Sequence, residues 1–468
     1  MLFDNGFLIW LVMWLVIAAA ILCLQTRQSS HRVGLVLAYV FSLWLIHWLA
    51  AAMYVLPWYS NFNTDDVLAG LQQSTYAVAA FGVGSLLLSP LVRKIFSFPP
   101  ATLPRTPSLR TTRIYIIAGL VFYLLLGPLL SGPTITAVVT SGGSLITAGL
   151  VLKSWSAWKS QDRREFSKSL GLSLGLPFLT LITSGFIGYG TSALILVWAA
   201  VASFYRPRWK VLLVGVLSCY LGLSIYVTYM RDRTEVREVI WGGESYTNRF
   251  QVLYQTFGEF ELFDPYDPSH LDRIDRRLNQ SALVGMAIRN METGHQEFAQ
   301  GETIVDAAFA LVPRAIWRDK PVTGGSGNIV SKYTGIVFAE GTSVGVGPVL
   351  EFYINFGTMG VVIGFLIMGA IVGLIDEVAG ERMLSGDWQG FIFWFLPGIA
   401  FLQVGGQLAE VTSSAAGALI LAFLVKRLVF GRLRAVDEQS ALVVSRRAAL
   451  LTSSQASDNT THFIKSRR

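Results

Sequence analysis

The sequence predicts an all-α, multi-pass integral membrane protein with about eleven transmembrane helices, and three observations support this fold class. Hydrophobic residues make up 53% of the 468 residues and charged residues 14%, whereas a soluble protein carries about 25% charged residues. Apolar runs of about 20 residues, long enough to cross a bilayer, recur along the whole chain. Alternating segments typical of a transmembrane barrel are absent. The composition therefore excludes a series of water-soluble domains.

The predicted transmembrane helices follow one another between residues 6 and 431. The helices before the large loop are expected at 6–24, 33–57, 68–90, 114–131, 134–152, 169–187, 190–205 and 211–230. Those after it are expected at 348–375, 388–404 and 415–431. The first run has no basic region before it and no clear small-residue cleavage site. We therefore expect it to be retained as a membrane helix, and not removed as a signal peptide.

Lysine and arginine gather in every second short loop, which predicts the orientation of the chain. Basic residues such as Arg27, Arg93, Lys153 and Arg206 follow the odd-numbered helices, and the short loops between carry none. Because short cytoplasmic loops are enriched in Lys and Arg, the N-terminus is expected outside and the C-terminus in the cytoplasm. Only the acidic stretch "DEVAGERMLSGDW" after the ninth helix departs from this pattern. The net charge of +7 thus reflects membrane topology and does not indicate nucleic-acid binding.

The chain divides into four predicted regions. Residues 1–230 hold the first eight helices, 231–347 form a large extracytoplasmic (periplasmic) loop, 348–431 hold the last three helices, and 432–468 form a basic, disordered cytoplasmic tail. The loop carries 12 Lys or Arg and 16 Asp or Glu, so its basic clusters do not follow from general basicity. The two cysteines lie inside predicted helices and indicate no metal site, and no nucleotide-binding glycine motif occurs. We therefore expect no cofactor.

Two amphipathic helices are predicted inside the loop. The first covers "DPSHLDRIDRRLNQSALVGMAIRNMETG", in which Leu271 and Ile274 fall near one face and Arg273 toward another. The second covers "GETIVDAAFALV", with Thr303 as its N-cap and Asp306 at the capping-box position. This second helix is expected to end before Pro313, because proline disfavours a helical residue before it.

The segment "LVPRAIWRDKP" places three cations within seven residues at the end of the second loop helix. These cations, Arg314, Arg318 and Lys320, either reach lipid headgroups or form an anion site. Cations are under-used on outer loops, and a guanidinium can hold phosphate by two hydrogen bonds without losing its charge. We therefore favour the anion site. The glycine-rich stretch that follows is expected to have an irregular backbone.

Polar residues open the ninth predicted helix at "EFYINFG". Glu351 is a candidate general base, although a helix-end charge or an ion-pair partner explains it equally well. Tyr353 and Asn355 are candidate substrate-binding residues, and the alternatives are an interfacial anchor and a structural amide.

The other candidates for substrate binding are basic residues elsewhere in the loop: Arg233, Arg289 and Lys332. Arg231, Arg233 and Arg237 together act either as membrane anchors or as a second phosphate clamp. At the outer end of the tenth helix, Gln403, Gln407 and Glu410 line a cavity or make helix contacts.

The segment "PRAIWRDKP", the glycine-rich stretch after it and "EFYINFGTMGVVIGF" together resemble the Wzy-type polymerases of O-antigen and capsule repeat units. The resemblance is strongest over residues 300–365. Members of that family commonly read "WPDKP" where this chain reads "WRDKP", so Arg318 is not a family feature.

The resemblance implies a GT-C-like polymerase or ligase architecture in a bacterial inner membrane, and glycosyltransferase activity on undecaprenyl-pyrophosphate-linked oligosaccharides. A chain-length regulator and a flippase are the partners it implies, besides membrane lipids; nucleic acid is not a partner. Arg314, Lys320 and Arg318 would hold the leaving pyrophosphate, and Glu351 would deprotonate the acceptor hydroxyl.

Two other functions are considered. A ligase would use the same donor and a different acceptor. A flippase or transporter would place ionisable residues along its membrane helices, but the predicted helices are nearly free of them.

Overall fold

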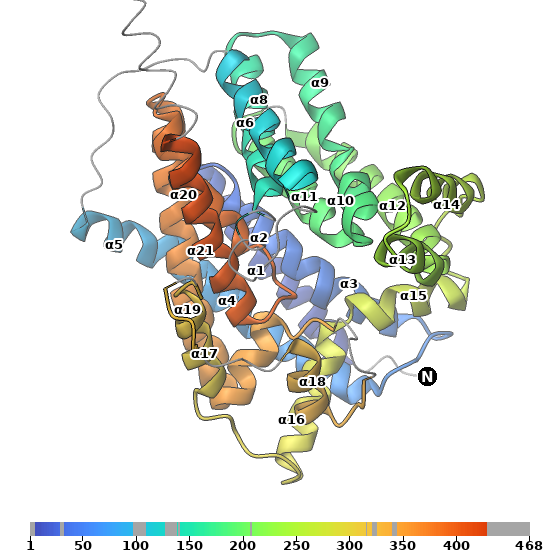
Figure 1. Cartoon of the computed structure of the whole chain (residues 1–468). Coiled ribbons are helices and arrows are strands. Elements are labelled where there is room, and N and C mark those ends of the chain that lie inside the picture. The colour runs from blue at the N-terminus through green and yellow to red at the C-terminus, as the bar shows by residue number, and fades with distance from the viewer. Residues whose placement is uncertain are drawn as a thin grey trace, which may run out of the picture. The chain divides into compact units, whose positions relative to one another are not determined.

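The computed structural model describes residues 5–28, 32–96, 109–126, 138, 141–205, 208–314, 316–320, 325–338 and 344–427. The chain consists of two compact units, Met1–Leu419 and Ile420–Arg468. Every regular element in the described ranges is a helix (Figure 1). The all-α prediction is confirmed for these residues.

The helices before the large loop include three that contain a π-helical turn. The full series before the loop is α1 (Asn5–Gln28), α2–η1–α3–η2 (Leu35–Val55), α4–η3–α5 (Thr64–Ile95), α6–η4 (Leu109–Leu126), α8 (Gly142–Lys159), α9 (Arg163–Ser173), α10 (Leu176–Ser184), α11 (Ile187–Phe204) and α12 (Arg208–Arg231), in which η1, η3 and η4 are the π-helical turns.

The loop region and the helices after it form a second series. It contains α13 (Arg233–Trp241), α14 (Tyr246–Gly258), α15 (Pro268–Leu278), α16 (Gln280–Glu292), α17 (Glu302–Ala310), α18 (Ser326–Thr334), α19 (Gly347–Leu384), α20 (Trp388–Ala400) and α21 (Leu408–Val425).

Among the described residues, 8 helices are long and apolar enough to cross a membrane. They start at Gly6, Leu35, Thr64, Arg163, Ile187, Leu213, Gly347 and Leu408. The three other predicted spans meet shorter or shifted helices: Thr111–Leu126, α8, and the 13-residue α20. The protein is a helical membrane protein, and the number of eleven spans stays a prediction.

Ion pairs connect the end of α19 with the ends of the first and third spans. Arg32, after α1, pairs with Glu377 at 2.5 Å, and Arg93 of α5 contacts both Glu377 and Glu381. The acidic stretch after the ninth predicted span therefore lies with the basic ends of the first and third spans. Helix α19 continues to Leu384, beyond the predicted end at residue 375, and carries these carboxylates.

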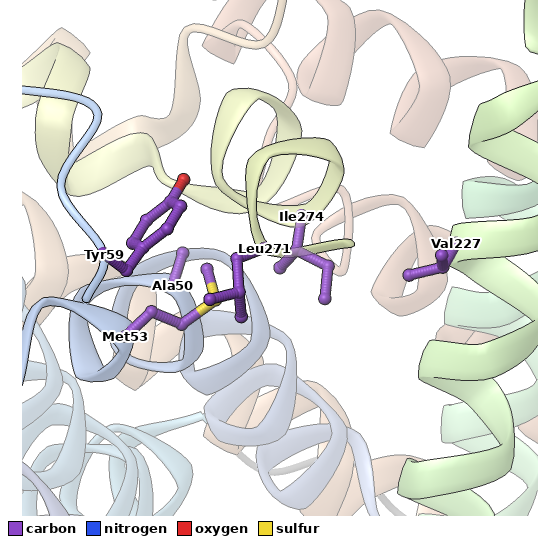
Figure 2. Close-up of a cluster of buried hydrophobic side chains, with 6 residues drawn as sticks. All are labelled: Ala50, Met53, Tyr59, Val227, Leu271 and Ile274. Carbon is purple, nitrogen blue, oxygen red and sulfur yellow. The ribbon is translucent and has the colours of Figure 1, made fainter. Parts of the chain in front are cut away.

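The loop after the second span lies against the large loop. Asp275 of α15 accepts hydrogen bonds from Tyr54, Tyr59 and Asn61, at 2.8, 3.0 and 3.2 Å. Beside these bonds, Leu271 and Ile274 of α15 pack with Ala50, Met53, Tyr59 and Val227 in one apolar cluster (Figure 2). The large loop is thus a packed helical layer on this part of the bundle.

The first predicted loop helix is two helices, because Asn279 interrupts it. Asn279 has φ −97° and ψ 74°, its side chain accepts from the Ala282 N–H at 3.0 Å, and it donates to Asp275 at 2.7 Å. Helix α16 then packs closely along α4 (Figure 1). A Cβ on Gly70 of α4 would overlap the carbonyl oxygen of Ser281 in α16.

Two further local predictions are wrong. Gly301, with φ 95°, is the N-cap of α17 and no side chain caps this helix, because Thr303 bonds elsewhere. The glycine-rich stretch after Pro321 contains a helix, α18, over Ser326–Thr334.

Candidate functional site

Helix α19 is broken near its start, and the break organises the candidate site. Phe356 (φ −143°, ψ 22°) and Gly357 (φ 61°, ψ −153°) are not helical. Such a break in a membrane helix is tolerated where protein or a wet cavity surrounds it. The first part of α19, which ends at Asn355, is therefore a short separate helix with its own contacts.

Asn355 attaches α17 to this short helix. Its Oδ1 accepts from the Gly301 N–H at 2.8 Å, and its Nδ2 donates to the Thr303 hydroxyl at 2.7 Å and to the Glu351 carbonyl at 2.7 Å. The Ala299 N–H donates to the Ile354 carbonyl at 2.8 Å. These bonds explain the burial of Asn355 as a structural amide, and substrate contact by this residue stays a prediction.

Glu351 is fully buried, one helical turn before Asn355. Its Oε2 accepts from the N–H of Leu408, the first residue of α21, at 2.7 Å, where the helix dipole favours a negative charge. Its Oε1 is buried and accepts no hydrogen bond from the described part of the chain, while the Thr303 side chain lies against the carboxylate. Because buried polar atoms are nearly always bonded, this oxygen is the unusual feature of the site.

Two further carboxylates interact electrostatically with Glu351: Glu410 of α21 and Asp306 of α17. Within the described residues, none of the three takes part in an ion pair. Asp306 is half-buried, and burial and the nearby Glu302 raise the pKa of its carboxyl. The sequence analysis assigned Asp306 only a capping role. Its spacing of three residues from Thr303 on one helix was the signal that it shares a face with the site.

The predicted cations form a compact turn after α17. Arg314 donates to the Lys320 carbonyl at 2.8 Å, and the Lys320 ammonium donates to the carbonyl of Val312 at 3.1 Å. Burial and the charge of Arg314 lower the pKa of Lys320. Arg318 is exposed. The structure thus brings Arg314 and Lys320 together and leaves Arg318 at the surface.

Helix α17 connects the carboxylates with the cations. Thr303, in its first turn, lies against Glu351, and the carbonyl of Ala310, its last residue, is 3.5 Å from the Lys320 ammonium. At a rise of about 1.5 Å per residue, these two ends are about 10 Å apart along the helix axis. A buried carboxyl group and a pair of basic side chains therefore lie at opposite ends of one short helix.

The remaining predicted residues lie in three other places. Lys332 of α18 lies over the Tyr333 ring at 5.2 Å. The Tyr353 ring is 6.5 Å from that of Phe298. Arg289 of α16 pairs with the buried Asp66 of α4 at 2.9 Å, so its charge serves the packing of these two helices.

The structure separates the three arginines at the exit of α12. Arg231 is held by Asp232 at 2.8 Å and Glu261 at 2.7 Å. Arg233 and Arg237 instead interact electrostatically with Arg277 of α15. No ion pair in the described ranges includes Arg233, Arg237 or Arg277. We refer to Arg233, Arg237 and Arg277 as the arginine group.

An apolar cavity of about 200 Å³ lies between the second predicted span, α12 and α15. Its lining includes Met53, Leu223 of α12, and Leu271 and Ile274 of α15. Ile274, which lines the cavity, lies one helical turn before Arg277 on α15.

The comparisons with known proteins give one match. The model of a domain family described as a domain of unknown function, DUF8712, matches residues 144–407. No curated protein and no solved structure matches the chain. The matched residues make up more than half of the chain and include Arg233, the arginine–lysine turn and Glu351. The chain belongs to the DUF8712 family.

Proposed function

We propose that the protein is a glycosyltransferase that polymerises lipid-linked oligosaccharides. It would transfer a growing glycan from undecaprenyl pyrophosphate to the sugar end of a lipid-linked repeat unit. One observation carries the proposal: the buried Glu351 carboxylate, with one unbonded oxygen, lies against the start of α17, and two adjacent cations lie at the end of α17. Glycosyl transfer from a pyrophosphate needs both, a base for the acceptor and positive charge for the leaving group.

The cations would act on the leaving group. As the bond between the anomeric carbon and the pyrophosphate oxygen breaks, negative charge accumulates on the pyrophosphate, and fixed positive groups stabilise it. Arg314 and Lys320 are already held together by the hydrogen bond from Arg314 to the Lys320 carbonyl. The donor itself carries the activation, so no nucleotide is required.

The carboxylate would act on the acceptor. Its hydroxyl oxygen bonds to the anomeric carbon while its proton passes to Oε1 of Glu351. Thr303 lies against this carboxylate, so we propose that α17 shifts when both substrates bind. Asp306 is half-buried on the same helix and would assist proton transfer to solvent.

The acceptor also carries a lipid pyrophosphate, and the arginine group suits it. Its three guanidinium groups complement phosphate charge, and the apolar cavity that Leu271 and Ile274 of the same α15 helix line suits part of a polyprenyl chain. This placement supports the second-clamp interpretation for Arg233 and Arg237, whereas the ion pairs of Arg231 give it a structural role.

The test is an assay with purified protein and a lipid-linked repeat unit, without nucleotide sugar or metal. We expect a ladder of longer lipid-linked glycans. Products that stay at one repeat, with folded wild-type protein, would overturn the proposal. Reporter fusions that place Leu311–Pro321 in the cytosol would also contradict it, because we place the site on the outer face of a bacterial inner membrane, with the N-terminus outside and the C-terminus inside.

Two other functions have distinct readouts. A ligase predicts that a deletion strain accumulates long unattached chains, whereas a polymerase predicts single-repeat products. The break in α19 favours a transporter, because discontinuous helices are frequent in transporters. Translocation of a labelled lipid-linked sugar across proteoliposomes, without chain elongation, would support that function instead.

A further inference from the structure

A second cavity lies beside the broken helix and belongs to none of the groups above. Its volume is about 300 Å³. Residues 296–300 and Glu302 line one side, and Lys332 and Tyr333 of α18 line the other. It therefore joins the segment before α17 to the helix that carries Lys332.

The side chains around this cavity suit a hydroxyl-rich ligand. Gln296 and Gln300 each offer two donors and an acceptor, Glu297 and Glu302 offer acceptors, and Lys332 offers donors. Two carboxylates and one ammonium give a net negative lining, which opposes the binding of a pyrophosphate. A sugar ring needs mixed donors and acceptors around its hydroxyl groups, and this lining provides them.

An aromatic ring completes the cavity. Phe298 is 46% exposed, so part of its ring is available to a ligand, and its other neighbour is the Tyr353 ring at 6.5 Å. Aromatic rings bury a large apolar face next to polar groups, which matches the mixed apolar and polar faces of a sugar.

The backbone at the cavity has an uncommon conformation. Gln300 has φ 48°, in the left-handed region that few non-glycine residues adopt. Such residues gather at ligand sites because the surrounding structure holds them in place. Here the Ala299 N–H donates to Ile354 and the Gly301 N–H donates to Asn355, both at 2.8 Å. The cavity wall is thus fixed to the break in α19.

The cavity is also next to the proposed chemistry. Glu302, in its wall, is the first residue of α17, and the following residue, Thr303, lies against Glu351. A ligand in the cavity would therefore contact the residue next to Thr303, near the buried carboxylate. The cations lie at the other end of α17.

We propose that this cavity binds the glycan of the acceptor, with Gln300 and Phe298 as specificity-determining residues. Sugar binding follows from the cavity itself, whereas its assignment to the acceptor rests on the proposed function. The two statements can therefore fail separately.

The test is an NMR titration of the purified protein with a free oligosaccharide. The probe is the oligosaccharide released by mild acid from the lipid-linked pool of the producing strain. Gln300→Gly removes the amide and keeps a residue suited to positive φ, and Phe298→Ala removes the ring. His295→Ala, at an exposed residue outside the cavity, is the matched control. We expect each cavity variant to bind at least about tenfold more weakly, which corresponds to 1.4 kcal/mol, and the control to bind as wild type.

Equal binding by the wild type and by both folded cavity variants would overturn the proposal. Displacement of the oligosaccharide by inorganic pyrophosphate would also overturn it, because the cavity would then be an anion site. Binding that depends on Gln300 and Phe298 in a protein that does not elongate chains would support the sugar site and contradict the polymerase. Chain elongation by a protein whose cavity variants bind the oligosaccharide as wild type would support the polymerase and contradict the sugar site.

Discussion

Two charged regions of the large loop are organised in opposite ways. Around Glu261, opposite charges are in contact: Arg231 lies 2.7 Å and Arg273 2.8 Å from its carboxylate. The His270 ring also lies 3.2 Å from this carboxylate. We call this set the Glu261 network. Around α17, Glu351 has no ion-pair partner within the described residues, and the cations lie at the far end of the helix.

The difference indicates a structural role for the Glu261 network and a chemical role for the residues around α17. In the Glu261 network each charged side chain is in contact with an opposite charge, so the network holds α12 to α15. Along α17 the carboxylate and the cations lie near opposite ends of a helix whose ends are about 10 Å apart along its axis, so no ion pair joins them in the described residues; in the proposed function each acts on a different part of the substrate. Mutations should therefore affect stability in the first region and activity in the second.

Glu351→Gln tests the second region most directly and should have the largest effect. The amide oxygen can still accept from the Leu408 N–H, so folding is expected to be retained, but a neutral amide cannot take a proton. We expect chain elongation to fall by about 100-fold or more, the usual contribution of a general base. The measurement is the rate of ladder formation by purified protein. Elongation at the wild-type rate would remove Glu351 from the mechanism.

Arg314→Ala should have the next largest effect, a loss of about 100-fold in elongation, because it removes one fixed donor from the leaving group. The product pattern in cells with equal amounts of membrane-inserted protein checks it. Arg318→Ala is the matched control, since Arg318 is exposed on the same turn, and should keep most of the activity. Normal polymer from the Arg314 variant would contradict the cation assignment.

Glu261→Gln should affect stability and leave activity unchanged. Burial acts against ionisation, but hydrogen bonds from Arg231 and Arg273 lower the pKa of Glu261. The amide cannot replace these charged bonds, so we expect a loss of about 2 kcal/mol in the free energy of unfolding. Equilibrium denaturation in detergent measures it. Lost activity with unchanged stability would show that the two regions do not divide as described.

The same carboxylate gives a pH dependence with a definite sign. Because the pKa of Glu261 is lower in the folded protein than in the unfolded chain, the folded form binds fewer protons than the unfolded chain as the pH falls from about 5 toward the folded pKa. The stabilisation is therefore complete at neutral pH and is lost as the pH falls through the folded pKa. The Glu261→Gln variant should lack this part of the acid dependence. An identical acid profile in both proteins would contradict the assignment.

The sequence predicted those features that depend on residues close together in the chain. The apolar runs predicted the membrane helices, and the segment from Gly301 to Pro313 predicted α17 to within a few residues. Residue spacing could not predict the bond from Leu408 to Glu351, which joins residues 57 positions apart, or the break at Asn279, where Asp275 is held by the loop after the second span. These features depend on tertiary packing, which periodicity does not contain.

Lys320→Arg should have the smallest effect and tests the cation turn without removing its charge. Burial and the charge of Arg314 lower the pKa of Lys320, so the wild-type turn loses one positive charge at a lower pH than an ordinary lysine would. Arginine stays charged throughout this range. We expect near-wild-type elongation at pH 7 and an alkaline decline that begins at higher pH in the variant. A pH–rate profile measures both. If the decline occurs at the same pH in both proteins, the charge of Lys320 does not act on the leaving group, and only its contacts with the α17 carbonyls remain as its role.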